Sequence, residues 1–469
     1  MTLESLTAIS PLDGRYRTRT GDLSDLVSEF GLIRLRVEVM IEWFIHLANE
    51  PSIENATKLD PATEDQCRDI WRHFNIDDAR TVQAIESEIN HDVKAVEYFV
   101  KNKLQDLGLE ECIEFVHFAC TSEDVNNLAY GLLLSRSRQT CLLPAIEGVL
   151  QAIAILAREY AETPMLSRTH GQPASPTTVG KELANFAARM EVCLDDLENC
   201  PIYGKMNGAV GNYNAHVIAY PHVNWTSLSE DFVSSLGLTF NPMTTQIEPH
   251  DYMAKLFQEL QAINQVLLDF NRDVWGYISI GYFKQRLIEN EVGSSTMPHK
   301  VNPIDFENAE GQIGLAGALL NHLATKLTVS RWQRDLSDST ALRSVGTAFA
   351  HCMVAYSSTL RGIHKLELDN DVITKDLEVS WEVLTEAIQT TMRKHGIKEP
   401  YERLKEWTRG RHFDAAVYRD ILSQLELPAE ALKELQALTP ATYIGLASSL
   451  AHQTASRVIS RKSSNPDAD

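Results

Sequence analysis

Between two long helical patterns the sequence reads Gly293-Ser294-Ser295-Thr296-Met297-Pro298-His299-Lys300-Val301-Asn302-Pro303. In residues 251–284, before this stretch, apolar side chains recur at steps of three or four, which predicts one apolar face of a helix. Residues 306–327, after it, repeat the pattern. Glycine and serine predict a mobile loop between the two helices, and functional residues concentrate in such connections.

The end of this stretch has the chemistry of a helix start. Asparagine is favoured at the N-cap and proline at the first helical position, so we expect Asn302 to be the N-cap and Pro303 to begin the helix. Lys300 and Asn302 would then lie at the positive end of a helix dipole, where backbone N–H groups point outward and anions bind. From the spacing alone, a polar loop that only starts a helix is the alternative.

The composition is that of a soluble globular protein with an acidic surface. Of the 469 residues, 44% are hydrophobic and 23% are charged, and the formal net charge is −21. Non-specific binding of nucleic acid needs a basic surface, so we expect no nucleic-acid partner. Small anionic substrates stay compatible with this charge, because a few convergent arginines can form a local positive pocket.

Neither a secretory signal nor a membrane span is expected. Residues 1–15 lack a basic segment followed by an apolar run. Residues 344–360 are free of Asp, Glu, Lys and Arg but are too short for a confident membrane span, and they predict a helix buried on most sides. The seven cysteines form no Cys-x-x-Cys pair, which favours reduced thiols in the cytoplasm. No spacing typical of metal ligands occurs, so we expect neither a metal nor an organic cofactor.

Helical periodicity predicts an all-α protein with a central bundle of unusually long helices. Besides the two helices already named, helical patterns occupy residues 23–49, 64–74, 79–87, 91–107, 125–140, 142–161 and 176–199. Residues 203–249 are rich in Gly, Asn, Pro and Thr, which predicts ordered loop with at most a few short strands. We expect three mainly helical domains at residues 1–111, 112–364 and 365–469.

Short polar stretches interrupt the helical patterns, at residues 90–92, 121–124, 167–173, 208–214 and 331–343. The first two are explained most simply as helix N-termini, because acidic side chains suit the first turn. His170 is followed by Gly171 and Pro173, so it must lie in a turn, where general acids and bases often sit.

Two of these stretches bear on ligands. Residues 331–343 carry three arginines and several hydroxyls, which indicates either a phosphate or carboxylate clamp or an ion-paired surface helix. Residues 208–214 are glycine-rich, but they are not G-x-G-x-x-G and give only weak support to a dinucleotide site. Taken together, hydroxyl, His, Lys, Asn and Arg side chains at helix ends suit acid–base chemistry on a polyanionic substrate.

Residues 293–303 closely resemble the signature loop of the fumarase/aspartase superfamily, the lyases that release fumarate. Further stretches resemble the adenylosuccinate lyase family within it: SPLDGRY (10–16), NHDVKAVEYF (90–99), HFACTSEDVNN (117–127), LSRTHGQPASPTTVGKE (166–182), GAVGNYNAH (208–216), TTQIEPHDY (244–252) and RWQRDLSDSTALR (331–343). The resemblance runs from about residue 6 to about residue 451.

This resemblance implies a fold, an assembly and a reaction. The implied fold has three mainly helical domains, and the implied assembly is a homotetramer around a twenty-helix core, with each active site built from loops of three subunits. The implied substrates are small nucleotides, adenylosuccinate and the succinyl-carboxamide ribonucleotide SAICAR. Both would release fumarate without a cofactor in the cytoplasm, and no nucleic acid or membrane is implied as a partner.

The resemblance also implies roles for individual residues. Ser294 matches the general base, and His170 matches the general acid. Matches to substrate-binding positions are Arg15, Tyr16, Asn90, His91, Asp92, Thr121, Ser122, Gln246, Ser295, Lys300, Asn302, Asn308, Arg334, Ser339 and Arg343.

Other interpretations stay open from the sequence. Argininosuccinate lyase, fumarase and aspartase belong to the same superfamily but act on substrates without a phosphate, so the arginines in residues 331–343 speak against them. A catalytically inactive helical scaffold, as among the lens crystallins of this superfamily, would not need the matched catalytic side chains. A nucleotide-binding regulator would bind AMP without releasing fumarate.

Overall fold

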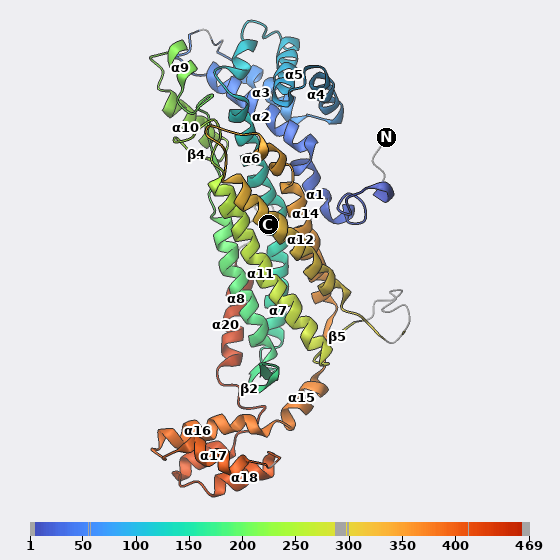
Figure 1. Cartoon of the computed structure of the whole chain (residues 1–469), viewed down its shortest axis with the longest axis vertical. Coiled ribbons are helices and arrows are strands. Elements are labelled where there is room, and N and C mark those ends of the chain that lie inside the picture. Colours follow the sequence, from blue (N-terminus) through green and yellow to red (C-terminus); the bar gives the residue numbers. More distant parts are fainter. Residues whose placement is uncertain are drawn as a thin grey trace.

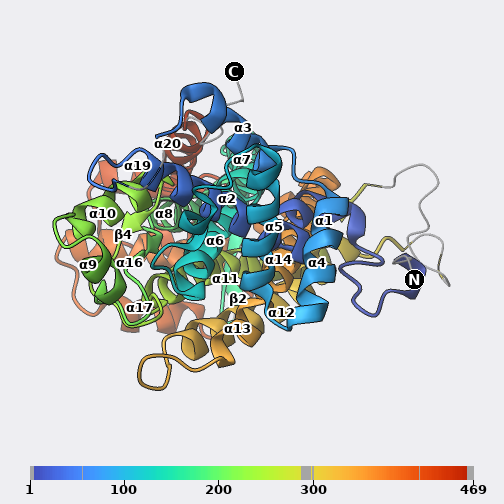
Figure 2. The ribbon, with the colours of Figure 1, turned by 90° about the horizontal axis from the view of Figure 1, so that it is seen from above.

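Long helices aligned with the longest axis of the molecule form its centre (Figures 1 and 2). They are α7 (Leu143–Glu159), α8 (Val179–Glu198), α11 (Asp251–Ser279), α12 (Ile304–Leu327) and α14 (Val345–His364). Neighbouring helices pack around the bundle in turn: α7 packs on α8, α8 on α11, α11 on α12, and α12 on α14. Helix α14 packs back on α7, so the bundle is closed. The computed structural model describes residues 5–54, 56, 58–286, 297, 300–410 and 412–461.

The apolar periodicity of the sequence accounts for this bundle. In α11 the side chains of Met253, Leu256, Leu260 and Leu267 recur at helical spacing, and all are buried. In α14, predicted to be buried on most sides, Ala348, Phe349, Val354 and Ala355 are each at most 1% exposed, so that prediction is confirmed. Burial of these apolar stripes is the main favourable contribution to folding.

The N-terminal segment and parts of the middle of the chain cover one end of the bundle (Figure 1). These elements are η1 (Ser5–Thr7), α1 (Arg17–Val27), α2 (Glu29–Ala48), α3 (Pro61–Arg72), α4 (Ile76–Ile89), α5 (Asp92–Asp106), η2 (Ile113–His117), α6 (Ser122–Ser137), β3 (Tyr203–Gly204), α9 (Asn214–Ala219), α10 (Trp225–Ser235), β4 (Thr239–Phe240) and α13 (Ser337–Leu342). Strands β3 and β4 form a short parallel pair within residues 203–249. The prediction of ordered loop for this region is wrong in part, because it also contains helices α9 and α10.

The other end carries a hairpin and the C-terminal helices (Figure 1). Its elements are β1 (Pro164–Thr169), β2 (Gln172–Thr178), β5 (Phe283–Gln285), β6 (Leu366–Leu368), α15 (Asn370–Glu378), η4 (Trp381–Leu384), α16 (Thr385–Lys394), α17 (Pro400–Thr408), α18 (Ala415–Ser423) and α19 (Ala429–Gln436). Strands β1 and β2 are antiparallel, as are β5 and β6. The last helix, α20 (Ala447–Ile459), returns to pack on α7 and α8. The domain limits given above stay a prediction.

Helix α6 continues into α7 through a π turn, where two separate helices were predicted. The turn is η3 (Arg138–Leu142), and Pro144 follows it near the start of α7. Proline lacks a backbone N–H and clashes with the preceding turn of an α-helix, whereas a π turn changes the local hydrogen bonding. The continuous stretch Ser122–Glu159 has 38 residues and is therefore about 57 Å long. It is apolar enough to cross a membrane by length and composition, but most of the residues in its apolar window are buried inside the protein.

Several other predicted helix limits are wrong, and those that change the path of the chain or a helix cap are described here. The pattern at 23–49 is broken by Ser28, whose extended backbone separates α1 from α2. The helix predicted from residue 176 begins at Val179, because the preceding residues form strand β2. Helix α11 ends at Ser279, and the chain continues into strand β5. Asn302 is not the N-cap of α12: the helix begins at Ile304, and the cap position is held by Pro303.

Candidate active site

The Thr121–Ser122 turn lies at the start of α6, at the N-terminal end of the bundle. The backbone N–H of Thr121 donates to Asp124 Oδ2 at 2.8 Å, so the predicted acidic first turn does cap this helix. Asp124 also accepts from the backbone N–H of Asn207 at 3.1 Å and lies 2.9 Å from Lys205 Nζ. Because both members of the Asp124–Lys205 pair are fully buried, the turn is fixed to the loop that follows β3.

Arg334 lies next to this turn. Its Nη2 donates to Ser339 Oγ at 3.1 Å and lies 3.1 Å from Glu123 Oε2, one residue after the turn. Gln246 donates to the backbone oxygen of Ala209 at 3.1 Å, in the same region. The structure therefore brings Thr121, Ser122, Gln246, Arg334 and Ser339 to one end of the bundle, although they are far apart in the sequence.

The predicted stretch at residues 90–92 forms the N-terminus of α5, as expected. Asn90 has a left-handed backbone with φ of 55° and is exposed. His91 is the N-cap, and its Nδ1 accepts from the backbone N–H of Lys94 at 3.2 Å. The imidazole is 51% exposed, so it can also contact a ligand.

Arg36 connects the 90–92 turn to α6. Its Nη2 lies 2.8 Å from Asp92 Oδ2, and its Nε donates to Asn126 Oδ1 at 2.9 Å. Burial is the largest single influence on the pKa of Asp92 and raises it. The charge of Arg36, together with hydrogen bonds from Arg36 and from the backbone N–H of Val93, outweighs burial and holds that pKa below its ordinary value. Arg343 Nη2 lies 3.8 Å from Asp92 Oδ2, so the 90–92 turn also reaches the arginine-rich stretch. We call this whole set the phosphate-end group, because the resemblance implies nucleotide and phosphate contacts for three of its members, Arg334, Ser339 and Arg343. The other members are Asn90, His91, Asp92, Thr121, Ser122 and Gln246.

A cluster of buried ionisable side chains lies beneath this group. The ligand atoms of Glu123, His250 and Asp338 all lie within 4.8 Å of one another. Carboxylates and imidazole can hold a metal ion. No metal was predicted, because the sequence has no tight spacing of metal ligands, and these three residues are remote from one another in it. Arg334 already pairs with both carboxylates, at 3.1 Å from Glu123 and 3.7 Å from Asp338. The motif stretches contained all of these residues, but only the fold brings them together.

A second set of predicted residues lies lower on the bundle. Tyr16 OH donates to Asn308 Oδ1 at 3.2 Å, and Asn308 Nδ2 donates to Ser358 Oγ at 2.8 Å. Ser358 lies about 20 Å along α14 from Arg343, at 1.5 Å per residue, so this pair is separate from the phosphate-end group. Arg15 precedes Tyr16 and is exposed.

The signature stretch reaches the bundle near this second set. Lys300 is exposed, and Asn302 is half-buried two residues before α12 begins. Ser294 and Ser295 lie outside the described residues, so their predicted roles cannot be placed. Tyr16 and Asn308 therefore mark where the described end of this stretch joins the fold.

His170 lies at the opposite end of the bundle, at the tip of the β1–β2 hairpin. It and Gly171 form the two-residue turn, with φ of 54° and 73°, so the predicted turn is confirmed. Paired positive φ angles are typical of a type I′ hairpin turn. His170 is exposed, and the α6–α7 stretch of about 57 Å separates this end from the Thr121–Ser122 turn. Within one chain, His170 and the phosphate-end group cannot meet on one substrate.

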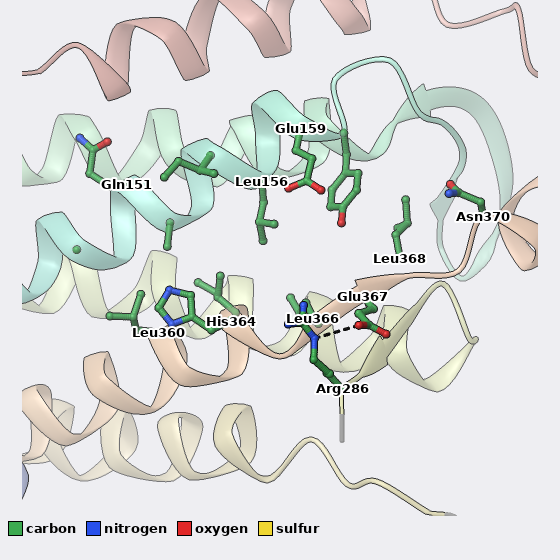
Figure 3. Close-up of a pocket in the computed structure, with 15 residues that line it drawn as sticks. Gln151, Leu156, Glu159, Arg286, Leu360, His364, Leu366, Glu367, Leu368 and Asn370 are labelled. Carbon is green, nitrogen blue, oxygen red and sulfur yellow. Dashed lines mark hydrogen bonds and ion pairs between the residues drawn. The ribbon is translucent and has the colours of Figure 1, made fainter. Parts of the chain in front are cut away.

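A pocket of about 810 Å³ opens on the flank of the bundle between α7, α14 and β6 (Figure 3). Gln151 and Glu159 face it from α7, and His364 faces it from α14. Arg286 and Glu367 form an ion pair of 3.0 Å at its edge. Among the residues that the structure describes, none of the predicted site residues lines this pocket.

Comparisons with known proteins identify the family. The model of the family described as "Lyase" matches residues 14–316, and that described as "Adenylosuccinate lyase C-terminal" matches residues 330–444. The adenylosuccinate lyase of Vibrio cholerae is 53% identical over 449 residues, which cover 95% of this chain and 98% of the relative. This chain belongs to the adenylosuccinate lyase family. The adenylosuccinate lyases of Haemophilus influenzae and Escherichia coli K12 are each 51% identical over 448 residues, with the same coverage.

Solved structures agree with the fold at much lower sequence identity. A fumarate lyase from Mesorhizobium sp. BNC1 has a TM-score of 0.72 at 18% identity, over 93% of this chain and 97% of that chain. The 3-carboxy-cis,cis-muconate lactonizing enzyme from Pseudomonas putida has a TM-score of 0.69 at 19% identity, with the same coverage. Membership of the adenylosuccinate lyase family also decides against the argininosuccinate lyase, fumarase and aspartase alternatives.

Proposed function

We propose that this protein eliminates fumarate from adenylosuccinate, giving AMP, and from SAICAR, giving the corresponding carboxamide ribonucleotide. Family membership supports the reaction class. The observation that favours a phosphorylated substrate is the phosphate-end group, where Arg334, Ser339 and the Thr121–Ser122 turn lie together. Guanidinium and hydroxyl groups suit a phosphate, and the turn adds the N-terminus of a long helix.

The elimination needs a base, an acid and donors for the developing charge. Ser294 removes the proton from the carbon next to one carboxylate of the succinyl group. The electron pair left on that carbon forms the double bond of fumarate as the C–N bond breaks, and His170 protonates the departing nitrogen. Lys300 and Asn302 bind the succinyl carboxylates, where charge builds up as the proton leaves. Ser295 lies beside the base in the sequence and completes the carboxylate contacts.

A complete site in this proposal draws residues from different subunits. His170 and the phosphate-end group lie at opposite ends of one chain, farther apart than a nucleotide can reach. A third part of the site is formed by Tyr16 and Asn308. Lys300 and Asn302 lie shortly before Asn308 in the sequence and belong to this part. A homotetramer built around a twenty-helix core would bring the three positions of different copies to one substrate. The protein acts in the cytoplasm on small nucleotides and requires no cofactor.

The test is fumarate release from adenylosuccinate by the purified protein, followed by absorbance. The wild-type protein should release fumarate and AMP in equal amounts, whereas argininosuccinate should give none. Ser294→Ala should keep nucleotide binding but lower turnover by at least ~10². Turnover near the wild-type value in Ser294→Ala would show that another group is the base.

A further inference from the structure

Four ionisable side chains from separate elements meet beneath the phosphate-end group. Glu123 belongs to the first turn of α6, Asp338 to α13, and His250 is the N-cap of α11, while Arg334 precedes α13. The side chains of Glu123, Asp338 and Arg334 are 3%, 4% and 14% exposed. Charged side chains this buried are rare unless they are paired, so each charge here needs a partner.

Arg334 is the common partner in this cluster. Its Nη2 lies 3.1 Å from Glu123 Oε2 and donates to Ser339 Oγ at 3.1 Å, while its Nε lies 3.7 Å from Asp338 Oδ2. An arginine has a long stem with many rotamers, and ordering it costs entropy unless contacts fix the planar guanidinium. Glu123 contacts the guanidinium at Nη2 and Asp338 lies near Nε, and the two carboxylates belong to different helices. The Asp338 contact is an ion pair without a hydrogen bond, because Arg334 Nε and Asp338 Oδ2 have no hydrogen-bond partner among the described residues.

Glu123, His250 and Asp338 could instead bind a divalent metal ion, in place of the Arg334 guanidinium. Two observations favour Arg334 as the cation. Its guanidinium already lies within ion-pair distance of both carboxylates, so a metal ion would have to displace a buried side chain. Burial also lowers the pKa of His250, so the imidazole adds no positive charge near neutral pH.

We propose that Glu123 is a positioning residue, which with Asp338 holds the Arg334 guanidinium in the orientation that meets the substrate phosphate. This inference rests on the proposed function, in which Arg334 is a phosphate contact. Glu123 itself does not touch the substrate. Its removal therefore weakens binding of the phosphate more than it slows the chemical step.

The first experiment measures kcat and KM for adenylosuccinate in Glu123→Ala and Glu123→Gln. Glu123→Ala removes both acceptor oxygens, and we expect KM to rise about tenfold or more while kcat changes less than about threefold. Glu123→Gln keeps one acceptor for Arg334, so its KM should rise less than that of Glu123→Ala. The matched control is Asp65→Asn, which removes a carboxylate from an exposed pair with Arg72; it should leave both constants unchanged.

The second experiment measures the dissociation constant of AMP by calorimetry. Binding to Glu123→Ala should be about tenfold weaker than binding to the wild-type protein, and binding to Glu123→Gln should be weakened less. This measurement needs no turnover, so it stays informative where the elimination assay fails. It also serves when Glu123→Ala does not fold, because Glu123→Gln keeps the shape of the side chain.

Several results would overturn the inference. An unchanged KM in folded Glu123→Ala would show that Arg334 needs no such support. An unchanged AMP affinity in folded Glu123→Ala would contradict the inference in the same way. Stoichiometric metal in the purified protein, lost in Asp338→Asn together with AMP affinity, would make the cluster a metal site. A wild-type protein that binds AMP but releases no fumarate would instead contradict the proposed function alone.

Discussion

At the scale of single residues, the buried pair of Asp124 and Lys205 determines how the Thr121–Ser122 turn is held. Asp124 accepts hydrogen bonds from the backbone N–H of Thr121 in the turn and of Asn207 in the loop after β3, and it pairs with a fully buried lysine. Lys205 Nζ also donates to the backbone oxygen of Gly208 at 3.0 Å. A buried ion pair with this many hydrogen bonds specifies one arrangement of the two loops.

Asp124→Asn removes one charge of this pair and leaves the other buried. We expect the free energy of unfolding to fall by about 3–5 kcal/mol, measured by denaturant titration. Asp65→Asn breaks an exposed pair with Arg72 and should cost less than about 1 kcal/mol. Equal losses in the two variants would mean that burial of the Asp124–Lys205 pair has no energetic consequence.

His216 gives the protein a defined acid sensitivity. Its imidazole is fully buried against the rings of Tyr213 and Trp225, and burial lowers its pKa to about 4 from an ordinary value of 6.5. Between these two pKa values the imidazole is protonated in the unfolded chain but not in the folded chain. Stability is therefore lost as the pH falls from about 6.5 towards 4. Between pH 7 and pH 5 the loss from this group is about 2 kcal/mol.

Replacing this histidine should remove that contribution. In His216→Phe, unfolding measured at pH 7 and pH 5 should show a difference in free energy smaller than the wild-type difference by about 2 kcal/mol. The aromatic ring keeps the contacts with Tyr213 and Trp225. An unchanged pH dependence would contradict a buried neutral imidazole at this position.

At the scale of elements, the C-terminal helices hold the hairpin that carries His170. Asp376 of α15 accepts hydrogen bonds from Arg168 on β1 and from the hydroxyl of Tyr282. Glu386 of α16 accepts a hydrogen bond from Ser175 on β2. Each strand of the hairpin is therefore tied to the C-terminal helices by a carboxylate, at a point near its tip.

Asp376→Asn weakens the tie to β1 and should displace His170, the proposed general acid. We expect kcat to fall roughly tenfold with a smaller change in KM, because a small displacement of a catalytic group is costly. Asp371→Asn, on the exposed side of the same helix, is the matched control. A kcat equal to the wild-type value would show that the hairpin, or a neighbouring subunit, orients His170 without Asp376.

At the scale of the whole molecule, the length of the bundle separates the predicted catalytic residues. We predict that His170→Ala and Ser294→Ala are each nearly inactive alone, and that mixing them with subunit exchange restores part of the activity. The restored sites would combine an intact hairpin from one copy with an intact signature loop from another. The measurement is fumarate release after the mixed subunits reassemble.

The control for this mixture is a pair of variants within one group. Thr121→Ala and Arg334→Ala both alter the phosphate-end group, which lies within one chain, so their mixture should show no recovery beyond the parent activities. Recovery in this control would count against the grouping of residues seen in the fold. No recovery for His170→Ala with Ser294→Ala, after confirmed exchange, would count against shared sites.

Much of the fold was predictable because local patterns decide helices. The period of apolar residues in α11 and α14 indicated long buried helices, and the acidic first turn of α6 indicated its capped N-terminus. His170 was predicted in a turn because glycine and proline follow it. The helix limits at Ser28, Val179 and Ile304 were wrong, because extended and capping conformations depend on neighbours that periodicity does not describe.

The sequence by itself determined the helical class, the family and the residues that match its functional motifs, because these depend on local periodicity and on long, specific motifs. Only the tertiary structure decided that Arg334 lies between Glu123 and Asp338, and that His170 lies a bundle length from Thr121. The physical reason is that such contacts join residues hundreds of positions apart, and packing of the long helices sets which of them meet. The stretch that ends in Asn302-Pro303 joins the bundle near Tyr16 and Asn308, a position that no local pattern could predict.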